Sequence, residues 1–423
     1  MAVLAKPGVT SILPIIVDAE PRRRLAQMAA RFYPRQPEFI AGVTGTNGKT
    51  STARFAAQLW SLLGYEAGSL GTLGAQSGVY ERPLGHTTPD PVMLHETLDA
   101  MARAGVTHLA MEVSSHGLAQ FRADAVQFCV AAFTNITQDH LDYHDTFEDY
   151  FTAKGRLFST LLASNGVAAI NMDGERAEDV VELARARGVP TVQTGVKGRD
   201  ITLVSCTPHL GGLSLVIEAG GKTYRVETPL IGAFQAENVL LAAGMVVGAG
   251  VKFDDVILQL ENIEGAQGRM EFVGETKGAG VYVDYAHTPD AVGTALAAIR
   301  PHASGRVIAI IGAGGDRDKT KRPLMGAAAM KNADHVIVTD DNPRSEDPAA
   351  IRAGVLKGCP GAAEIGDRAE AIAAGVEMLA EGDVLLILGK GHEAGQQVGD
   401  QVLPFDDASV ARDVIAGRIK ELG

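Results

Sequence analysis

Apolar runs alternate with polar, glycine-rich turns along most of the chain from residue 38 onward. The first run, 39–43, is followed by a polar turn and an amphipathic stretch that ends at Gly64, a pattern typical of strand, loop and helix. Further apolar runs are predicted to be strands, at 108–113, 128–134 and 167–170. Continuous apolar strands that alternate with helices favour an α/β fold with a mostly parallel sheet covered on both faces.

A second region of the same kind begins after the glycine-rich stretch 265–268. Its four apolar runs, separated by helical patterns, predict a second parallel sheet, at 281–285, 307–312, 335–340 and 383–389. The connecting segment differs in character. Residues 201–230 are predicted to be short strands of a small antiparallel patch, and 236–250 a buried helix.

The first 37 residues form a short segment of their own. Residues 2–4 and 12–17 are predicted to be short buried strands, and 20–37 a helix with Pro21 in its first turn, followed by a linker. Two strands within about 35 residues cannot bury a core by themselves. We therefore expect three parts, with bounds 1–37, 38–267 and 268–423.

Composition and charge exclude several classes of protein. The chain has 423 residues and a net charge of −13, from 51 acidic and 38 basic residues, so nucleic acid is not expected as a partner. No apolar run reaches the roughly 18 residues that span a bilayer, and the first residues lack a signal-peptide pattern. Cys129, Cys206 and Cys359 are far apart, which fits a reducing cytoplasm and argues against disulfides or zinc. A cytoplasmic monomer is expected, although no feature of the sequence specifies the oligomeric state.

The turn after the first strand has the pattern of a phosphate-binding loop. It consists of Gly45, Thr46, Asn47, Gly48, Lys49, Thr50 and Ser51. Glycines let backbone N–H groups approach phosphate oxygens, the start of the following helix adds positive potential, and Lys49 adds a charge. Thr50 or Ser51 could place a hydroxyl on Mg²⁺. The strict motif has glycine where this chain has Val43, but the strand–turn–helix context disfavours the alternative of a chance Gly-Lys turn.

Two residues at neighbouring strand ends are candidate Mg²⁺ ligands for an ATP site. Glu112 lies at the end of the run 108–113, and His140 follows the run 128–134. Mg²⁺ prefers hard oxygen ligands, and divalent metals sometimes accept imidazole. His140 taken alone would be interpreted as an ordinary loop histidine. Its register with Glu112 and Lys49 favours the metal-site interpretation.

Each predicted strand of the second region runs into a polar motif at its carboxyl end. The motifs are DYAHTPD (284–290), GAGGDRDKTKRP (312–323), TDDNPRSED (339–347) and LGKGHE (388–393). One such motif would indicate little, because loops are commonly polar and rich in glycine. Ligands of open α/β sheets bind outside the carboxyl ends of the strands, so four motifs at equivalent ends predict one ligand-binding crevice.

In combination these motifs resemble those of the Mur ligases of peptidoglycan synthesis, in particular the members that add 2,6-diaminopimelate. The resemblance covers residues 38–423. It rests on GTNGKTS, TTPD (87–90), EVSSHGL (112–118), DHLDYH (139–144), AKGRLF (153–158), FQAEN (234–238), GRMEFV (268–273), DYAHTPD, GGDRDKTKRPLMG (314–326), DDNPR (340–344) and GKGHE (389–393).

The resemblance implies three domains and an ATP-dependent ligase reaction. The family has a UDP-binding N-terminal domain, of which residues 1–37 would be a remnant, a central ATPase domain and a C-terminal Rossmann-like amino-acid-binding domain. ATP would phosphorylate the D-glutamate side chain of UDP-N-acetylmuramoyl-L-Ala-D-Glu, and the amine of meso-diaminopimelate would displace phosphate. Such a reaction depends on positioning and charge neutralisation, with Mg²⁺ as cofactor, and needs no side-chain nucleophile.

The resemblance also implies roles for individual residues. Lys49 and Thr50 would hold the ATP phosphates and Mg²⁺, with Glu112 and His140 as Mg²⁺ ligands. Lys154 matches the lysine that the family carbamylates to N6-carboxylysine, which converts a cation into an oxygen ligand. Without the resemblance, Lys154 would be interpreted as a solvated helix lysine. The remaining assignments are Asn238, Arg269 and His287 as nucleotide contacts, and Thr87, Thr88, Ser114, Gln120 and Arg122 as contacts to the muramoyl-dipeptide.

The expected amino-acid pocket is the most specific of these assignments. Asp341-Asn342-Pro343-Arg344 resembles the signature of diaminopimelate users, and lysine-adding relatives lack this arginine. A planar guanidinium binds the second carboxylate of diaminopimelate bidentately and would repel the terminal ammonium of lysine. Considered alone, the motif is as readily an Asn-Pro turn with a surface arginine. The implied pocket is completed by Arg317, Gly389 and Glu393.

Three questions stay open at this point. The uridine-binding segment of the family would lie before Met1, which favours a start codon set too late or a shortened chain over a natural variant. A folylpolyglutamate-synthase-like ligase shares the phosphate loop and domain order, but DNPR and EVSSHGL argue against it. A non-catalytic nucleotide-binding remnant is the third possibility. It is disfavoured by the intact Lys49, Glu112, His140, Lys154 and Arg344.

Overall fold

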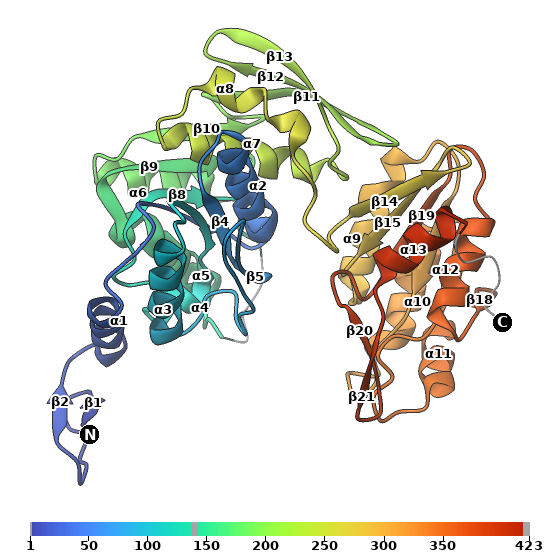
Figure 1. Ribbon diagram of the computed structural model, residues 1–423, viewed down its shortest axis with the longest axis horizontal. Coiled ribbons are helices and arrows are strands. Elements are labelled where there is room, and N and C mark those ends of the chain that lie inside the picture. The colour runs from blue at the N-terminus through green and yellow to red at the C-terminus, as the bar shows by residue number, and fades with distance from the viewer. Residues whose placement is uncertain (1, 138–142, 418–423) are drawn as a thin grey trace. The chain divides into compact units, whose positions relative to one another are not determined.

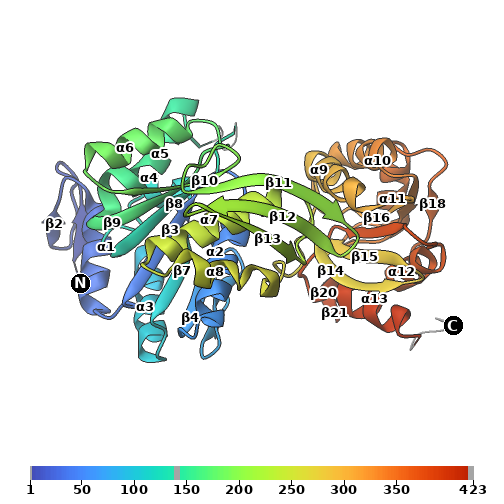
Figure 2. The ribbon, with the colours of Figure 1, turned by 90° about the horizontal axis from the view of Figure 1, so that it is seen from above.

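The computed structural model describes residues 2–137 and 143–417, which divide into two compact units. The first unit comprises Met1–Ser205, Leu215–Val226 and Gln235–Ile263, and the second comprises Cys206–Ser214, Glu227–Phe234 and Glu264–Gly423. Figures 1 and 2 show both units, each built from helices and a central sheet. Within the described ranges, no helix has the length and apolar character needed to span a membrane.

The first half of the chain forms one large sheet and a separate strand pair. The strands are β1 (Val3–Ala5), β2 (Ile15–Val17), β3 (Phe39–Thr44), β4 (Ala67–Gly71), β5 (Gly74–Ser77), β6 (Glu81–Arg82), β7 (His108–Glu112), β8 (Phe128–Phe133), β9 (Leu162–Asn171), β10 (Thr191–Gly195), β11 (Ile201–His209), β12 (Gly212–Ala219) and β13 (Lys222–Thr228). The helices are α1 (Pro21–Phe32), α2 (Lys49–Leu62), α3 (Pro91–Arg103), α4 (Ser115–Ala119), α5 (Phe147–Arg156), a π-helical turn (Leu157–Leu161), α6 (Ala177–Ala186), α7 (Phe234–Gly248), α8 (Phe253–Ile257) and a 3₁₀ turn (Leu260–Asn262).

The large sheet has the order β13-β12-β11-β10-β9-β8-β3-β7-β4-β5-β6, and its central part is parallel. This confirms the expected α/β fold with mostly parallel strands. Strand β3 lies between β7 and β8 and pairs with both in parallel. The carboxyl ends of these three strands, Thr44, Glu112 and Phe133, therefore meet at one edge of the sheet. The phosphate loop begins at this edge.

Both faces of the central strands are covered by helices, as near-continuous apolar strands require. One buried cluster joins Met111 of β7 and Phe133 of β8 to Tyr150 of α5 and Val180 of α6. Figure 2 shows α5 and α6 on one side of these strands, and α2 and α7 on the other. The central strands are thus held rigidly between two helical layers.

The strands predicted within 201–230 are present as β11, β12 and β13, and they extend the main sheet because β11 pairs in parallel with β10. The prediction for the first two strands of the chain needs correction. Strands β1 and β2 pair with each other, but Ile16 and Val17 are 47% and 61% exposed rather than buried. A pair of three-residue strands has no second layer to cover its side chains.

The second unit is built on a six-stranded sheet with the order β14-β15-β19-β16-β17-β18. Its strands are β14 (Glu271–Thr276), β15 (Ala279–Asp284), β16 (Val307–Ile311), β17 (His335–Val338), β18 (Ala363–Glu364) and β19 (Val384–Leu388), and a hairpin follows with β20 (Gly395–Val398) and β21 (Gln401–Pro404). Its helices are α9 (Pro289–Ile299), a 3₁₀ turn (Arg300–His302), α10 (Lys321–Asn332), α11 (Pro348–Leu356), α12 (Arg368–Glu377) and α13 (Asp407–Ile415). Only β14 runs antiparallel within the six-stranded sheet.

Alternate residues of each central strand of this sheet enter different cores. Leu386 of β19 packs in the cluster that contains α9, α10 and α11, while Leu385 and Ile387 pack in the cluster that contains α12 and α13. Figure 2 shows these two groups of helices on opposite sides of the sheet. Because β15, β16, β17 and β19 are parallel, their carboxyl ends share one edge, and the four polar motifs follow that edge.

Candidate active site

The phosphate loop is held open at the start of α2. Gly48 is the N-cap of this helix, has a left-handed φ of 83° and offers no side-chain cap to the first N–H groups. Lys49 is the first residue of α2, and its Nζ donates to the main-chain oxygens of Gly45 at 3.0 Å and Thr46 at 2.8 Å. An uncapped helix start beside a lysine is a site for an anion such as phosphate.

Both loop glycines are required by close packing. A Cβ on Gly45 would lie 1.8 Å from Oγ1 of Thr134, and a Cβ on Gly48 would lie 2.3 Å from Oδ1 of Asn238. The chain after β8 also holds the loop, because the N–H of Asn47 donates to Oδ1 of Asn135 at 3.0 Å. The predicted nucleotide contact Asn238 therefore lies directly against the loop. Thr134 and Asn135 were not predicted, since nothing in their local sequence marks them.

Glu112 lies at the carboxyl end of β7 beside this loop and is 2% exposed. Its Oε2 accepts a hydrogen bond from Oγ1 of Thr50 at 3.0 Å, and its Oε1 accepts one from the N–H of Thr72 at 2.8 Å. Burial raises the pKa of Glu112, while the positive charge of Lys49 acts in the opposite direction. The structure thus brings together Glu112, Thr50 and Lys49, three of the predicted site residues. His140 lies outside the described residues.

Lys154 reaches the same loop from α5. Its Nζ donates to the main-chain oxygen of Gly45 at 2.7 Å and lies 4.4 Å from the centre of the Tyr150 ring. Tyr150 in turn forms a 3.0 Å hydrogen bond with Oγ1 of Thr46. Lys154 is 2% exposed, so its interpretation from spacing alone as a solvated lysine is wrong. The helical period does not reveal which face of α5 approaches the loop.

The five predicted dipeptide contacts lie near Glu112. Oγ1 of Thr88 donates to the main-chain oxygen of Glu112 at 3.1 Å and accepts from the N–H of Ser114 at 3.0 Å. Arg122 donates to the main-chain oxygen of Thr88 at 2.7 Å and to Oε1 of Gln120 at 2.7 Å. The last of the five, Thr87, bonds Oγ1 of Thr72 at 3.0 Å. Thr88 and Ser114 thus use their polar groups to order this region.

In the second unit, the motif 341–344 has an unusual backbone. Asn342 and Arg344 have φ values of 42° and 53°, in the left-handed region that non-glycine residues rarely adopt. Nη1 of Arg344 donates to the main-chain oxygen of Gly315 at 2.8 Å. Backbone strain of this kind is typical of functional sites. The alternative of an Asn-Pro turn with a surface arginine is disfavoured, because Arg344 is partly buried and bonds Gly315 in the motif 312–323.

The other predicted pocket residues surround this segment. Asp341 is 6% exposed, and a Cβ on Gly389 would lie 2.4 Å from its Oδ2. Burial raises the pKa of Asp341, although the charges of Arg368 and Lys390 oppose that shift. A separate contact joins Nδ2 of Asn342 to Oε2 of Glu393 at 2.8 Å. Arg317 is exposed on the adjacent loop.

The two predicted nucleotide contacts of the second unit, Arg269 and His287, both contact Tyr285. The guanidinium of Arg269 lies 4.9 Å from the centre of the Tyr285 ring, and Nδ1 of His287 is 2.9 Å from the main-chain oxygen of Tyr285. Asp284 organises this loop, because its carboxylate accepts from the N–H groups of Met270 and Ala286, both at 2.8 Å. These residues form one ordered group within the second unit.

Two family models match this chain and together cover most of it. Residues 43–246 match the Mur ligase middle domain, and residues 268–391 match the glutamate ligase domain of Mur ligases. The chain belongs to the Mur ligase family. This Mur ligase therefore carries both the middle and the glutamate ligase domain types of the family.

Relatives of this Mur ligase cover nearly its full length. It is 49% identical over 411 residues to the UDP-N-acetylmuramoyl-L-alanyl-D-glutamate–2,6-diaminopimelate ligase of Bradyrhizobium diazoefficiens, covering 96% of this chain and 85% of that protein. It is also 49% identical over 425 residues to the enzyme of the same name from Caulobacter vibrioides, covering 98% of this chain and 87% of that protein.

Solved structures agree with the sequence comparison. A structure of a UDP-N-acetylmuramoyl-L-alanyl-D-glutamate–2,6-diaminopimelate ligase matches this Mur ligase with a TM-score of 0.77 and 34% identity, over 99% of this chain and 87% of that one. Folylpolyglutamate synthase from Mycobacterium tuberculosis, complexed with ADP and AMPPCP, matches with a TM-score of 0.65 and 19% identity, over 87% of this chain and 92% of that one. At that identity the second match shows a shared fold only.

One ion-pair network of this Mur ligase was not predicted from its sequence. Glu346 accepts hydrogen bonds from Arg322 at 2.8 and 3.1 Å and from the N–H of Asp316 at 2.7 Å, and it pairs with Lys319 at 3.1 Å. The Arg322 guanidinium, with these neighbours, lowers the pKa of Glu346 to about 2. The network joins the 312–323 loop to the 339–347 loop. Both motifs were recognised, but their charged partners cannot be paired from sequence alone.

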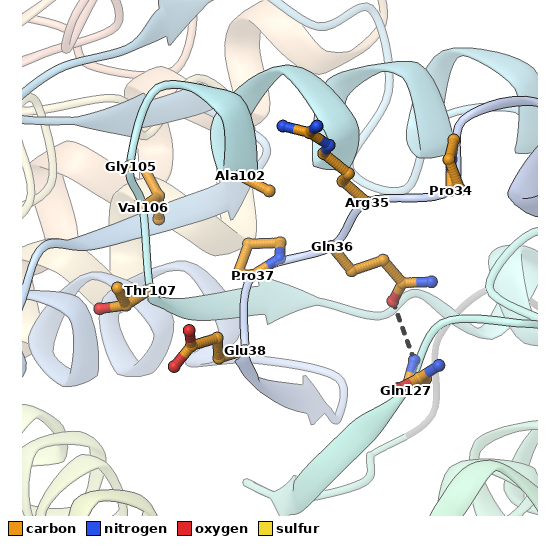
Figure 3. A pocket seen from close by; sticks show the side chains of 10 residues that line it. All are labelled: Pro34, Arg35, Gln36, Pro37, Glu38, Ala102, Gly105, Val106, Thr107 and Gln127. Atoms are coloured by element: carbon orange, nitrogen blue, oxygen red, sulfur yellow. Dashed lines mark hydrogen bonds between the residues drawn. The ribbon is translucent and has the colours of Figure 1, made fainter.

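A cavity of 520 Å³ in the first unit of this Mur ligase lies away from the phosphate loop. It is lined by the linker 34–38 and by residues at the starts of β7 and β8, including Thr107 and Gln127. Figure 3 shows the side chain of Gln36 extending to Gln127. The main-chain N–H of Gln127 donates a hydrogen bond to Oε1 of Gln36 at 3.1 Å. Glu38 precedes β3, whereas the phosphate loop follows it, so the cavity lies at the other end of the strands. None of the predicted site residues lines it.

Proposed function

We propose that this chain is an ATP-dependent ligase that joins meso-2,6-diaminopimelate to the D-glutamate of UDP-N-acetylmuramoyl-L-Ala-D-Glu. The names of its full-length relatives support this reaction in peptidoglycan precursor synthesis. The observation that carries the proposal within the molecule is the pairing of Glu112 with Thr50 beside the phosphate loop. Its nucleotide-linked substrate and its free cysteines favour a cytoplasmic enzyme.

The groups around Glu112 fit Mg²⁺. Burial raises the pKa of the Glu112 carboxyl group and so disfavours its ionised form. A cation bound beside it would stabilise the ionised carboxylate. Thr50 offers a hydroxyl oxygen at the same point. Other ligands in the proposal are His140, the ATP phosphates and Lys154 as N6-carboxylysine. When bound, Mg²⁺ would neutralise charge on the phosphates during transfer.

The first chemical step in the proposal is phosphoryl transfer from ATP to the D-glutamate carboxylate, which gives an acyl phosphate and ADP. The N–H groups at the start of α2 and the ammonium of Lys49 bind the phosphate oxygens. Asn238, packed against Gly48, supports the nucleotide from α7. Thr87, Thr88, Ser114, Gln120 and Arg122 hold the dipeptide so that its carboxylate faces the γ-phosphate, and Thr88 also orders Ser114 and Arg122.

The second step is attack by the amine of diaminopimelate on the acyl carbon. Phosphate leaves from the tetrahedral intermediate, the amine loses a proton, and an amide bond remains. Arg344 binds the distal carboxylate with Arg317 as a further carboxylate partner, Gly389 offers a backbone contact, and Glu393 faces the distal ammonium. The contact between Arg344 and Gly315 orients the guanidinium before the substrate arrives. Lysine lacks the carboxylate that this guanidinium would bind.

A direct test of the ligase reaction is phosphate release. The purified chain, supplied with ATP, Mg²⁺ and UDP-N-acetylmuramoyl-L-Ala-D-Glu, should release phosphate only when diaminopimelate is added. A folylpolyglutamate-synthase-like enzyme would instead respond to a folate substrate with glutamate. A non-catalytic remnant would bind ATP without turnover, and this result would overturn the proposal.

A further inference from the structure

Lys390 is a buried cation that contacts the pocket residues Asn342 and Glu393. It follows Gly389 in the motif after β19 and is 0% exposed. Its Nζ donates to the main-chain oxygen of Gly395 at 2.5 Å and to Oδ1 of Asn342 at 3.3 Å. It also lies 3.6 Å from Oε2 of Glu393. One ammonium thus contacts two pocket side chains and the start of β20.

The contacts of Asn342 fix the orientation of its amide. Its Oδ1 faces two groups that can only donate, the Lys390 ammonium and the N–H of Gln397, the latter at 2.8 Å. The Nδ2 must then point the other way, and it donates to Oε2 of Glu393. Oε2 of Glu393 is therefore held by Asn342 and Lys390. The carboxylate side chain is still 36% exposed and so can reach a ligand.

The same cation stabilises the hairpin that holds Arg344. Lys390 bonds Gly395 at the first position of β20, and the main chain of β20 pairs with Arg344. The N–H of Arg344 donates to the oxygen of Gln397 at 3.1 Å, and the N–H of Gly399 donates to the oxygen of Arg344 at 2.8 Å. These bonds flank the residue with the left-handed backbone, so the hairpin supports its strained conformation.

A purely structural role does not account for a charged group at this point. Removing an ammonium from water is costly, and an apolar side chain of similar volume would usually stabilise a core as well or better. The neighbouring buried cation Arg368 is matched by Asp407, with bonds of 2.6 and 2.7 Å. Lys390 instead directs its donors to a backbone oxygen and to side chains that face the pocket.

We propose that Lys390 is a positioning residue for the amino-acid substrate, holding Asn342 and Glu393 in the arrangement that binds the distal amino-acid head of diaminopimelate. The inference rests on the proposed function, because it concerns the same pocket. Lys390 itself is covered by these residues and acts through them. Its removal should therefore affect recognition of the amino acid and leave the ATP site unchanged.

The test compares Lys390→Met with the unsubstituted chain in the ligation assay. We expect the KM for meso-diaminopimelate to rise at least tenfold, while the KM values for ATP and for the muramoyl-dipeptide stay within about twofold. In a Glu393→Gln background, Lys390→Met should raise that KM less, because the part of its effect that passes through Glu393 is already lost. If Lys390→Met does not fold, Lys390→Gln tests the same expectation.

A matched control separates positioning from loss of stability. Arg306→Met removes a 2.6 Å ion pair to buried Asp383 at the opposite end of the same sheet. It should lower the melting temperature and leave all three KM values unchanged. The inference would be overturned, and the proposed function left standing, by an unchanged KM for diaminopimelate in Lys390→Met or by an equal rise in all three KM values. An effect of Lys390→Met that is fully additive with that of Glu393→Gln would also overturn it. Failure of the unsubstituted chain to ligate diaminopimelate would overturn the proposed function and this inference with it.

Discussion

Lys154 donates a hydrogen bond of 2.7 Å from its Nζ to the main-chain oxygen of Gly45, although 109 residues separate them in sequence. The bond fixes a lysine of α5 against the phosphate loop, in a position that is almost completely buried. A buried ammonium beside a phosphate site is well placed either to bind phosphate or, after carbamylation, to bind a metal. The second role is the one proposed here.

Replacing Lys154 tests that role. Lys154→Ala should reduce ligation by roughly 100-fold or more, because a charged group that positions the reaction is lost. Formate or acetate should restore part of the activity by supplying the missing carboxylate. Lys197→Ala, which removes an exposed lysine of the same unit, is the control and should keep full activity. Full activity in Lys154→Ala would eliminate the carbamate role.

Lys49 should be needed for transfer of the phosphoryl group. Lys49→Met removes the charge that lies at the mouth of the loop, so kcat should fall by roughly 100- to 1,000-fold. The fold should persist, because the hydrogen bonds from Nζ of Lys49 to Gly45 and Thr46 lie within the loop itself. Steady-state kinetics measure kcat, and a thermal melting curve shows whether the variant is folded. A normal kcat in this variant would contradict the phosphate-loop assignment.

The elements around both sites could be predicted from sequence because their strands are apolar on both faces. Runs such as 307–312 and 383–389 read as buried strands, and the glycine-rich turns after them mark the carboxyl edge of the sheet. The short strands β4, β5 and β6 were not predicted, because they are rich in glycine, serine and polar residues and show no regular alternation of hydrophobic and polar positions. Thr72, which bonds Glu112, lies between β4 and β5 and was missed with them.

Partners that lie far apart in sequence were also beyond prediction. The contact of Asn135 with Asn47, and that of Lys390 with Asn342, depend on which loops meet at the edge of each sheet. Family resemblance located Lys154, whereas its spacing in α5 suggested an exposed residue. The roles of the individual site residues and the three-part division at 37 and 267 stay predictions.

The network around Glu346 should make stability sensitive to acid. Its pKa is about 2 in the folded chain against a usual value of 4.5, so the unfolded state binds the proton first as the pH falls. The stabilisation by Glu346 is therefore complete above about pH 4.5 and is lost as the pH falls towards about 2. Glu346→Gln should melt at a lower temperature at neutral pH.

The difference in melting temperature between Glu346→Gln and the unsubstituted chain should shrink across this acidic range. Thermal melts of both proteins at a series of pH values measure it. Glu364→Gln, at the partly exposed pair with Arg352, serves as a control with a smaller effect. A difference that stays constant down to about pH 2.5 would show that Glu346 is not held as the structure indicates.

Arg344 should determine which amino acid is used. Arg344→Ala should raise the KM for meso-diaminopimelate about 10- to 100-fold, because a hydrogen bond to a charged group contributes about 1.5–3 kcal/mol. Arg344→Lys should also be impaired, since an ammonium cannot form the planar two-bond contact with a carboxylate. The KM for ATP should not change in either variant. Unaltered kinetics in both would remove the pocket assignment.

The most direct test of the central claim is a competition experiment with a mass readout. The purified chain receives ATP, Mg²⁺ and UDP-N-acetylmuramoyl-L-Ala-D-Glu with equal amounts of meso-diaminopimelate and L-lysine, and the products are separated by mass. The account predicts a tripeptide product that contains diaminopimelate and little or none that contains lysine. A lysine product in equal or greater amount, or no ligation by a folded chain that binds ATP, would contradict it.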